Sequence, residues 1–471
     1  MELLGHTPNF KNLLSDKRLE KRAALISQSL LMSKTSSVKG ATLDEAEQKG
    51  FYRFLDNEKV TEELLTKEMT LRCGTNVSGR DVLVIEDSSS FGLSKQSKHK
   101  KKDSGLGLVG NKTGTGFLTH CSLVLDAHLE TMLGISDVQL WHRTEDKGNN
   151  TTKLYKRQSI EEKESYKWIK ASEASKDVLQ TARSLTIIQD REGDIYEQFC
   201  LVPNRKTNLI IRNRDNRKLT EGEKLHEVLS QMPADGTYQL AITADIRKER
   251  IKRIATLEIR YKKVTIVKPA NLKRVDIADT LELYVVEAKE INTKAKDAIK
   301  WRLLTTRQVA SLDDALLIIG YYKKRWYIEQ LFRLLKKQGF RIEDTQLLTG
   351  WAIRKLTVLV LNAALRVMQV YMAYGKEESQ PIEEVFTSDE IKCLNKIEQN
   401  LLKETPKVIN TFNKNKLSWA SWIIARLGGW KGNTKQRRAG PITIKRGLEK
   451  FEMIYQGWKL YFLQLEDVST Q

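Results

Sequence analysis

The chain has 471 residues, 40% of them hydrophobic and 30% charged, which indicates a folded, soluble protein of two or three domains. Lysine and arginine number 80 against 60 aspartates and glutamates, and the net charge of +20 favours a polyanionic partner, most simply nucleic acid. The four cysteines form no CxxC pair and the amino end has no signal-peptide pattern. We therefore expect a cytoplasmic protein without structural zinc or disulfides.

Residues 1 to about 70 predict a small helical head with basic faces. The stretch "LSDKRLEKRAALISQSLL" predicts a helix capped by Ser15, with Arg22 among the cations that lie opposite an apolar face. The stretch "TLDEAEQKGFYRFLDNEKVTEELL" predicts further helix, with Arg53 close to a break at Gly50. A head of this kind suits DNA binding, and a dimerisation bundle is the alternative.

Two buried strands each end in acidic residues. In "RDVLVIEDSSS" an apolar strand at 82–85 is followed by Glu86 and Asp87, and in "SLTIIQDREGDIYEQF" a strand at 185–188 delivers Asp190. An aspartate at the end of a strand is often only the cap of a turn or helix, and that interpretation is open for each residue taken singly. Because the pattern occurs twice, a shared chemical role is the competing interpretation.

Between and after these strands the chain alternates strands and helices. "FLTHCSLVLDAHLETMLGISDVQLW" predicts two strands around a turn, "EEKESYKWIKASEAS" predicts a helix, and "WRLLTT" predicts a further strand. "NLIIRNRDNRK" predicts a strand followed by basic residues that include Arg212 and Arg214, and residues from about 220 to 300 alternate like a β insertion. Asp194 is expected to cap the next helix, and the charged run 95–105 is expected to be a loop.

The stretch "YYKKRWYIEQLFRLLKKQGF" at 321–340 places one glutamate among many cations. Its apolar spacing predicts a helix. At about 100° per residue, four functional side chains fall within roughly 60° of one another: Tyr322, Arg325, Glu329 and Lys336. The plain interpretation is an ion pair between Arg325 and Glu329, with solvated lysines around it. The alternative is that Glu329 completes an acidic site.

The last part of the chain predicts helices. The apolar run from Leu356 carries polar residues on one face, which predicts a core or interface helix and not a membrane span. Further on, "LSWASWIIARLGGW" predicts a helix whose apolar face has little chain left to cover it, formed by Trp419, Trp422, Ile423 and Leu427. Aromatic faces of this kind favour a self-complementary dimer interface, and packing onto the protein's own core is the alternative.

Asp87, Asp190 and Glu329 together form a set of hard oxygen ligands. Three converging carboxylates can hold Mg²⁺, with Mn²⁺ as a substitute. Two such ions about 4 Å apart can serve in-line phosphoryl transfer, by activating the attacking oxygen and stabilising the leaving one. Glu86 or Glu192 could replace its neighbouring aspartate as a ligand. The set therefore predicts metal-dependent cleavage of a nucleic acid.

These motifs resemble those of the insertion-sequence-four family of bacterial DDE transposases. The family signature Y-(2)-R-(3)-E-(6)-K is matched without departure by Tyr322, Arg325, Glu329 and Lys336. "VIEDSSS" and "DREGDIY" are similar to the two acidic motifs of the family and place its metal-binding aspartates at Asp87 and Asp190. "YRFLDN" near the start and "WIIARLGGW" near the end are also similar, so the resemblance spans nearly the whole chain.

The resemblance implies an α/β fold. A ribonuclease-H-like catalytic core at 71–370, with a β insertion at about 220–300, would follow a helical DNA-binding domain at 1–70 and precede a helical dimerisation domain at 371–471. It also implies a cut-and-paste transposase that binds the inverted repeats of transposon ends, excises the element through a hairpin and joins it to target DNA. The implied cofactors are two Mg²⁺ ions per active site. The implied partners are double-stranded DNA and a second copy of the chain, which forms a homodimer in the synaptic complex. The resemblance implies no membrane contact and a location in the bacterial cytoplasm, at the nucleoid.

By the same resemblance, several residues are expected to contact DNA. Trp301 and Trp326 match positions that stack on a base flipped out during hairpin formation, and buried core aromatics are the alternative. Leu19 stands where a relative has an arginine, so recognition of the end sequence is expected to differ. A nuclease or resolvase of the same fold, and a non-catalytic end-binding inhibitor, are the competing functions. The other expected contacts are Tyr322, Arg325, Arg333, Lys336, Arg212, Arg214, Arg22 and Arg53.

Overall fold

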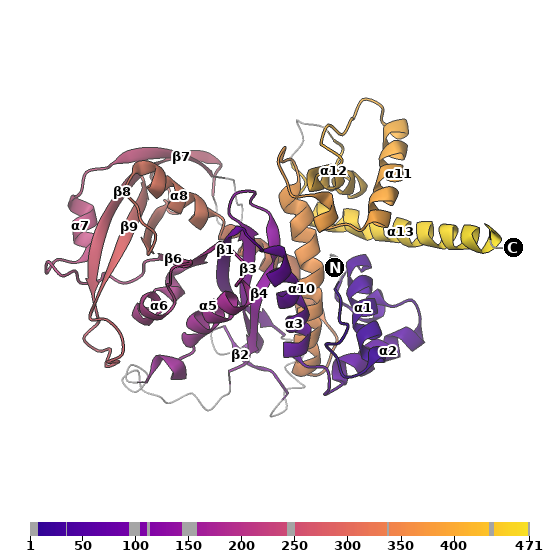
Figure 1. The fold of residues 1–471 in the computed structure, drawn as a ribbon, viewed down its shortest axis with the longest axis horizontal. Helices are drawn as coiled ribbons and strands as arrows, with labels where there is room; N and C mark the ends of the chain where they lie inside the picture. Colours follow the sequence, from indigo (N-terminus) through magenta and orange to yellow (C-terminus); the bar gives the residue numbers. More distant parts are fainter. Residues whose placement is uncertain are drawn as a thin grey trace.

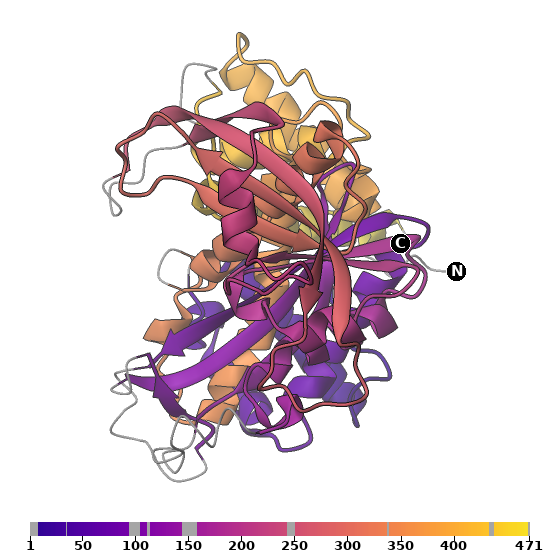
Figure 2. The ribbon, with the colours of Figure 1, turned by 90° about the vertical axis from the view of Figure 1, so that its left-hand side faces the viewer.

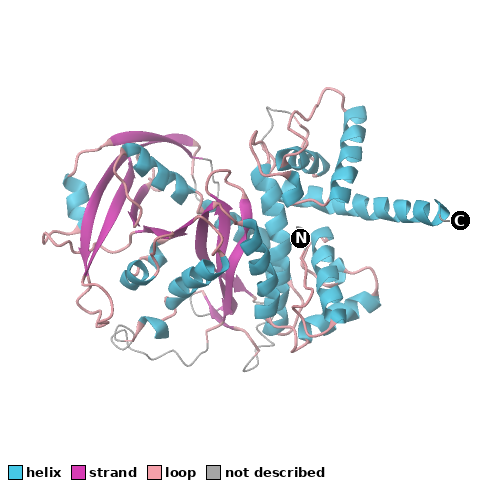
Figure 3. Ribbon diagram, viewed as in Figure 1, coloured by secondary structure: helices cyan, strands magenta, loops and turns pink. Residues whose placement is uncertain are grey.

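The computed structural model describes residues 8–33, 35–93, 104–110, 114–143, 158–242, 250–336, 339–432 and 438–469. Most of the charged run 95–105, predicted to be a loop, lies outside these residues. The strands gather in one half of the molecule and most helices in the other, and the long helix α10 (Gly350–Ala373) runs between the two halves (Figures 1 and 3).

The N-terminal helices are α1 (Lys17–Met32), α2 (Glu45–Asp56) and α3 (Glu62–Asn76). Asp16, and not Ser15, caps α1, because its carboxylate accepts a hydrogen bond from the backbone N–H of Arg18 at 2.7 Å. The predicted break at Gly50 is also wrong, since α2 continues through that residue. A Cβ at Gly50 would lie 2.8 Å from the guanidinium of Arg22, so the glycine lets α1 and α2 pack closely.

Within the described residues the strands form a single mixed sheet. One half has the order β4-β3-β1-β5-β6, in which β3 is antiparallel to β1 and β4, while β1, β5 and β6 are parallel. The short strand β2 pairs with the end of β3. The bounds are β1 (Asp81–Gly92), β2 (Gly107–Val109), β3 (Gly114–Asp126), β4 (Met132–Trp141), β5 (Ser184–Gln189) and β6 (Thr207–Arg212).

The strand-rich region predicted at about 220–300 is present. The strands β10, β9, β8 and β7 follow β6 in that order, all antiparallel, and so extend the same sheet. Right-handed twist splays these strands away from β1 and β3 (Figure 2). The region also contains a short helix that the alternating pattern did not predict. The bounds are α7 (Leu225–Gln231), β7 (Gly236–Ile242), β8 (Arg253–Val267), β9 (Thr280–Glu290) and β10 (Lys300–Thr305).

Side-chain alternation along the strands divides the core into two clusters. On one face, Leu83, Ile85 and Ile188 belong to the large cluster that includes α9 (Trp326–Leu335) and α10. On the other face, Val84 and Ile187 pack with α5 (Tyr166–Val178) and α6 (Tyr196–Leu201). A one-residue step along β1 or β5 therefore moves a side chain from the α9 face to the α5 face.

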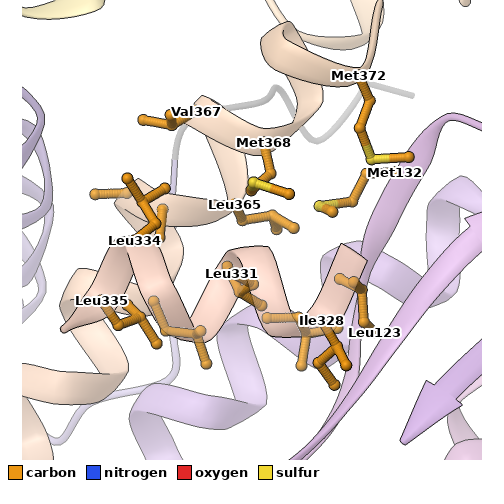
Figure 4. Close-up of a cluster of buried hydrophobic side chains, with 14 of the residues drawn as sticks. Leu123, Met132, Ile328, Leu331, Leu334, Leu335, Leu365, Val367, Met368 and Met372 are labelled. Atoms are coloured by element: carbon orange, nitrogen blue, oxygen red, sulfur yellow. The ribbon is translucent and has the colours of Figure 1, made fainter. Parts of the chain in front are cut away.

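The single helix predicted at 321–340 is divided in two. The helix α8 (Leu312–Lys323) ends before Lys324, and Arg325 is the N-cap residue of α9. The apolar side of α9 is fixed in the core, where Ile328 and Leu331 lie among side chains of α10 and β3 (Figure 4). The opposite side of α9 is left to carry Glu329, which is partly exposed.

The helix α10 is the one described helix long and apolar enough to cross a membrane, but 94% of its most apolar window is buried inside the protein. It packs against α1, α2 and α3 on one side and against α12 (Leu417–Leu427) and α13 (Pro441–Ser469) on the other. Its buried Arg366 donates to Glu390 at 2.6 Å and to Glu452 at 3.0 Å. These contacts support the prediction of a core helix.

The prediction of an uncovered apolar face around "LSWASWIIARLGGW" is wrong. Trp419 and Ile423 are 0% exposed and Trp422 is 6% exposed, because α12 packs against α10, α13 and α11 (Ser388–Glu404). Trp419 also donates its indole N–H to Glu398 at 2.7 Å. The helix α13, in contrast, projects from the body of the molecule (Figure 1). Met453, Ile454 and Leu460 are exposed on it.

Candidate active site

Asp87 lies on β1 where the pairing of that strand changes. The strand does not end at this residue, as predicted, but continues to Gly92 because its second half stays paired with β3. Pairing with β5, however, is found only as far as Ile85 opposite Ile188. Asp87 is therefore held by its pairing with β3 and lies beyond the last residue of β1 that pairs with β5. Its side chain points to the α9 face, as alternation requires.

Arg325 connects two of the predicted acidic residues. Its guanidinium donates from Nη1 to Asp87 Oδ2 at 2.9 Å and from Nη2 to Glu329 Oε1. The ion pair with Glu329 was the plain interpretation of the sequence, and it is present, but Asp87 shares the same guanidinium. Arg325 and Asp87 are each 17% exposed and Glu329 is 30% exposed. The contacts thus bring strand β1 and helix α9 together around one cation.

Asp190 follows β5 directly and also caps a turn. Its carboxylate accepts from the backbone N–H of Glu192 at 2.8 Å, at the start of the 3₁₀ turn Arg191–Gly193. The capping interpretation is therefore correct as far as it goes. The second carboxylate oxygen has room for another role, because a carboxylate can accept several bonds.

The charges of Asp190 and Glu329 both act on the carboxyl group of Asp87. Burial raises the pKa of Asp87 to about 7; Arg325 opposes this rise, and the negative charges of Asp190 and Glu329 add to it. A further positive charge nearby would stabilise the ionised form of such a carboxyl group. Carboxylate oxygens are the donors that Mg²⁺ prefers, so the three side chains suit a divalent cation in their chemistry. In the conformation described, no three acidic, histidine or cysteine side chains of the described residues are close enough to share an ion.

Aromatic residues lie beside this acidic group. Tyr322, at the end of α8, is 4% exposed, and burial raises the pKa of its hydroxyl, an effect that the nearby Arg325 and Arg212 reduce. Trp301 on β10 packs edge-on against Tyr322, with ring centroids 5.5 Å apart and planes at 67°. Trp301 is partly exposed and so is not one of the fully buried core aromatics. The predicted stacking residue therefore adjoins the signature tyrosine.

The other predicted cations lie around the same helix and strands. The ammonium of Lys336, at the end of α9, is 5.4 Å from the ring centroid of Phe91. Arg333 stacks on Trp326 at 5.1 Å from its centroid, and the tryptophan is 37% exposed. Arg212 donates to the backbone carbonyl of Lys300 at 3.2 Å, and this contact ties β6 to β10.

The head residues are separate from the acidic group. Arg22 on α1 and Arg53 on α2 lie across α10 from the sheet (Figure 1). Arg53 is exposed and Arg22 is partly exposed. The structure therefore presents two basic regions, one at the head and one near Glu329.

Of the two glutamates that could replace a neighbouring aspartate as a ligand, the structure rules out Glu86 and leaves Glu192 untested. Glu86 is 0% exposed on the α5 face and cannot replace Asp87 as a ligand on the α9 face. Glu192 is 65% exposed, and Lys167 lies 3.4 Å from it. The alternation seen at 82–85 would have been enough to place Glu86 on the other face.

Asp194 does not cap the following helix. Its carboxylate pairs with the buried guanidinium of Arg217 and accepts from the side chain of Asn213 at 3.0 Å and from the backbone of Arg214 at 2.7 Å. These bonds fix the loop after β6 to the turn after β5. Arg214, predicted to contact DNA, is 54% exposed on this loop and pairs with Asp215 at 3.2 Å. No local sequence pattern would have indicated the partnership, since the residues are far apart in the chain.

Comparison with known proteins identifies the chain. Residues 10–60 match the family described as transposase DNA-binding, and residues 79–366 match the family described as transposase DDE domain. Among solved structures, the chain is similar to a piggyBac transposase in a synaptic complex with hairpin DNA, at 10% identity and a TM-score of 0.38, over 93% of this chain and 71% of that one. At that TM-score the likeness carries no further argument. The two family matches cover more than half of the sequence, and the protein belongs to the DDE transposases.

Proposed function

We propose that the protein is a cut-and-paste DNA transposase of the insertion-sequence-four family. It would bind the inverted repeats of its transposon ends, excise the element through a hairpin and join it to target DNA. The protein would act in the bacterial cytoplasm, at the nucleoid. Its net charge of +20 suits a chain that must hold two kinds of DNA, the element and the target.

The observation that carries this proposal is the contact of Arg325 with both Asp87 and Glu329. Together with the effect of Asp190 on the pKa of Asp87, it gathers the acidic residues from β1, from the end of β5 and from α9. Strand alternation and the packing of α9 produce this convergence from residues that are far apart in sequence. We take these contacts as support for a catalytic group formed by Asp87, Asp190 and Glu329.

Asp87, Asp190 and Glu329 would hold two Mg²⁺ ions, or Mn²⁺ in their place. The bound ions would supply an activated oxygen nucleophile and stabilise the leaving oxygen of the cleaved strand. The negative charges of Asp190 and Glu329 beside Asp87 would favour a divalent cation at this point. Arg325 would balance the charge of Asp87 and Glu329 and orient both carboxylates.

DNA would be held by the residues around the acidic group and by the head. Tyr322, Lys336 and Arg333 would contact phosphates, and Trp301 or Trp326 would stack on the flipped base. Arg325, Arg212 and Arg214 would contribute near the cleaved strand, whereas Arg22 and Arg53 would recognise the end from the head. The two basic regions suit a DNA duplex that is bound at one place and cut at another.

We further propose the domain layout expected from the sequence, with the sheet order β4-β3-β1-β5-β6 as the ribonuclease-H-like core. The β insertion then follows β6, and the helices from about 371 onward form the C-terminal domain. Because α10 packs against both helical regions, the domains share one helix instead of meeting at a linker.

The active assembly would be a homodimer in which each subunit cuts the end that its partner's head recognises. Since α12 is buried, the exposed side chains of α13, among them Met453 and Leu460, are better candidates for the contact. An apolar face on a projecting helix can be covered by the same face of a second copy.

The test is a strand-transfer assay with DNA that carries the element's own terminal inverted repeats and a separate target plasmid. We expect joined product with Mg²⁺ and end-bearing DNA, and none when the repeats are scrambled. Cleavage of the ends without joining would make the protein a nuclease or resolvase. Binding without cleavage would make it an inhibitor, and either result would refute the proposed function.

A further inference from the structure

Glu86 and Gln189 form a buried pair directly behind the acidic group. Both side chains are 0% exposed, and Gln189 Nε2 donates to Glu86 Oε2 at 2.6 Å. Ser172 on α5 donates to Glu86 at 3.1 Å. Because successive strand residues point to opposite faces, the pair lies on the α5 face while the aspartates that follow each member, Asp87 and Asp190, lie on the α9 face. Glu86 thus immediately precedes Asp87 in the chain, and Gln189 immediately precedes Asp190.

The pair occupies the point where the backbone no longer joins the two strands. The parallel register between β1 and β5 ends with Ile85 opposite Ile188. One residue later, β1 remains paired with β3, and Gln189 of β5 pairs with Ile211 of β6. Among the described residues, the bond between Glu86 and Gln189 is therefore the next connection between the strands before the two aspartates.

Close packing fixes the side chain of Gln189 from the other side. A Cβ added to Gly193 would lie 2.3 Å from Gln189 Oε1 and 2.8 Å from Gln189 Cβ, so the turn after Asp190 rests directly on this side chain. Gln189 thus touches strand β1 through Glu86 and the Asp190 turn through Gly193. A movement of β1 would therefore be transmitted to the turn after Asp190.

Polar side chains in this position carry a cost that apolar ones would avoid. The residues two places earlier, Val84 and Ile187, are apolar, buried and on the same face. Burial of a carboxyl group is unfavourable even when it is hydrogen-bonded, and Glu86 is 0% exposed. An apolar pair would fill the space, but it would impose no fixed donor-to-acceptor distance between the strands.

We propose that Glu86 and Gln189 are positioning residues that set the separation of Asp87 and Asp190, and through it the affinity for the divalent cation. The proposal rests on the proposed role of these aspartates as metal ligands. Side chains that orient the ligands of a metal typically change its affinity by about 10–100-fold when they are replaced.

The experiment measures Mn²⁺ binding to the full-length protein without DNA, by electron paramagnetic resonance of the free ion. Gln189→Leu removes the bond, and we expect Mn²⁺ to bind about 10-fold more weakly or worse. The matched control is Gln198→Leu. Gln198 is also 0% exposed and donates to Ser172 at 2.9 Å, but among the described hydrogen bonds its side chain makes none to Glu86 or Gln189. We expect this control to bind Mn²⁺ within about twofold of the unchanged protein.

A reversed pair tests whether the bond itself matters. The double variant Glu86→Gln, Gln189→Glu exchanges donor and acceptor, and we expect it to recover most of the Mn²⁺ affinity that Gln189→Leu loses. If Gln189→Leu does not fold, Gln189→Asn replaces it, since the shorter amide keeps the polarity but cannot span the distance. Equal Mn²⁺ affinity in the Gln189 and Gln198 variants, or no recovery in the folded reversed pair, would overturn the positioning role.

A third variant separates this proposal from the proposed function. Asp190→Asn should abolish the tight Mn²⁺ site. If it does so while the Gln189 variants bind normally, only the positioning role fails. If Asp190→Asn binds Mn²⁺ as well as the unchanged protein, the aspartates are not the ligands and the proposed metal site fails as well.

Discussion

The guanidinium of Arg325 donates to the carboxylate of Asp87 at 2.9 Å, although the two residues are 238 positions apart in the chain. The same guanidinium donates to Glu329, four residues further along. Asp87 nevertheless keeps a pKa raised to about 7, because burial opposes its charge and two carboxylates lie nearby. The acidic group is thus charge-compensated only in part without a metal ion.

Replacement of Asp87 by asparagine should stabilise the metal-free protein. In the folded protein the pKa of Asp87 is raised to about 7 from an ordinary value of 3.8, so the folded state binds this proton more tightly than the unfolded state. The free energy of unfolding therefore falls as the pH rises through that window. We expect Asp87→Asn to gain about 2–4 kcal/mol at pH 8 and less at pH 5. Denaturant unfolding in EDTA measures the free energy of unfolding at both pH values. No gain at pH 8 would show that the ionised carboxylate of Asp87 does not destabilise the folded protein.

Trp301→Ala should slow hairpin formation more than first-strand nicking. Only the hairpin requires a distorted end, and stacking on a flipped base contributes about 1–3 kcal/mol. Trp301→Phe keeps an aromatic ring and should recover part of the rate. Single-turnover assays on end-bearing DNA separate the two steps. Equal slowing of both steps in Trp301→Ala would return the residue to a packing role against Tyr322.

Trp419→Ala should destabilise the protein by about 3–5 kcal/mol, since it empties a fully buried site and removes the indole bond to Glu398. For comparison, Leu460→Ser on α13 changes a side chain that is 63% exposed and should alter stability by no more than about 0.5 kcal/mol. Deletion of residues beyond about 380 should likewise unfold the protein, because α12 and α13 complete its core. Denaturant unfolding of Trp419→Ala and Leu460→Ser measures the two losses of stability. Equal stabilities of these variants would contradict the packing described for α12.

Catalysis in trans predicts complementation between two inactive variants. Arg22→Ala impairs the head and Glu329→Ala impairs the active site, so a mixed dimer has one intact head and one intact active site on the same DNA end. We expect cleavage to recover partly when the two variants are mixed and mixed dimers are verified by differently sized tags. A mixture as inactive as either variant alone, with mixed dimers present, would mean that each subunit cuts the end it binds.

The sequence predicted the strands that deliver Asp87 and Asp190 and the pairing of Arg325 with Glu329, since these depend on local periodicity. It did not predict that β1 continues to Gly92, because that half of the strand depends on pairing with β3. The division between α8 and α9 was also missed, since the break contains neither glycine nor proline. Local patterns carry no signal for a boundary of that kind.

The errors at the C-terminus have a different cause. The apolar side of α12 was correctly located, but the residues that cover it come from α10 and α13, and their packing depends on the whole fold. Asp194 was misassigned for the same reason, because Arg217 reaches it from the next loop. Partnerships between distant segments are the part of the site that periodicity cannot supply.

The most direct test of the account is Mg²⁺-dependent nicking of a transposon end by three single variants, Asp87→Asn, Asp190→Asn and Glu329→Gln, with end binding measured on the same samples. Glu192→Gln, an exposed carboxylate beside Asp190, is the control. We predict that the three variants bind the end nearly as well as the unchanged protein, because cationic contacts elsewhere supply that affinity, and that none of them nicks it. Nicking at an undiminished rate by any of the three, or an equal loss in Glu192→Gln, would contradict the assignment of the three carboxylates as the catalytic site.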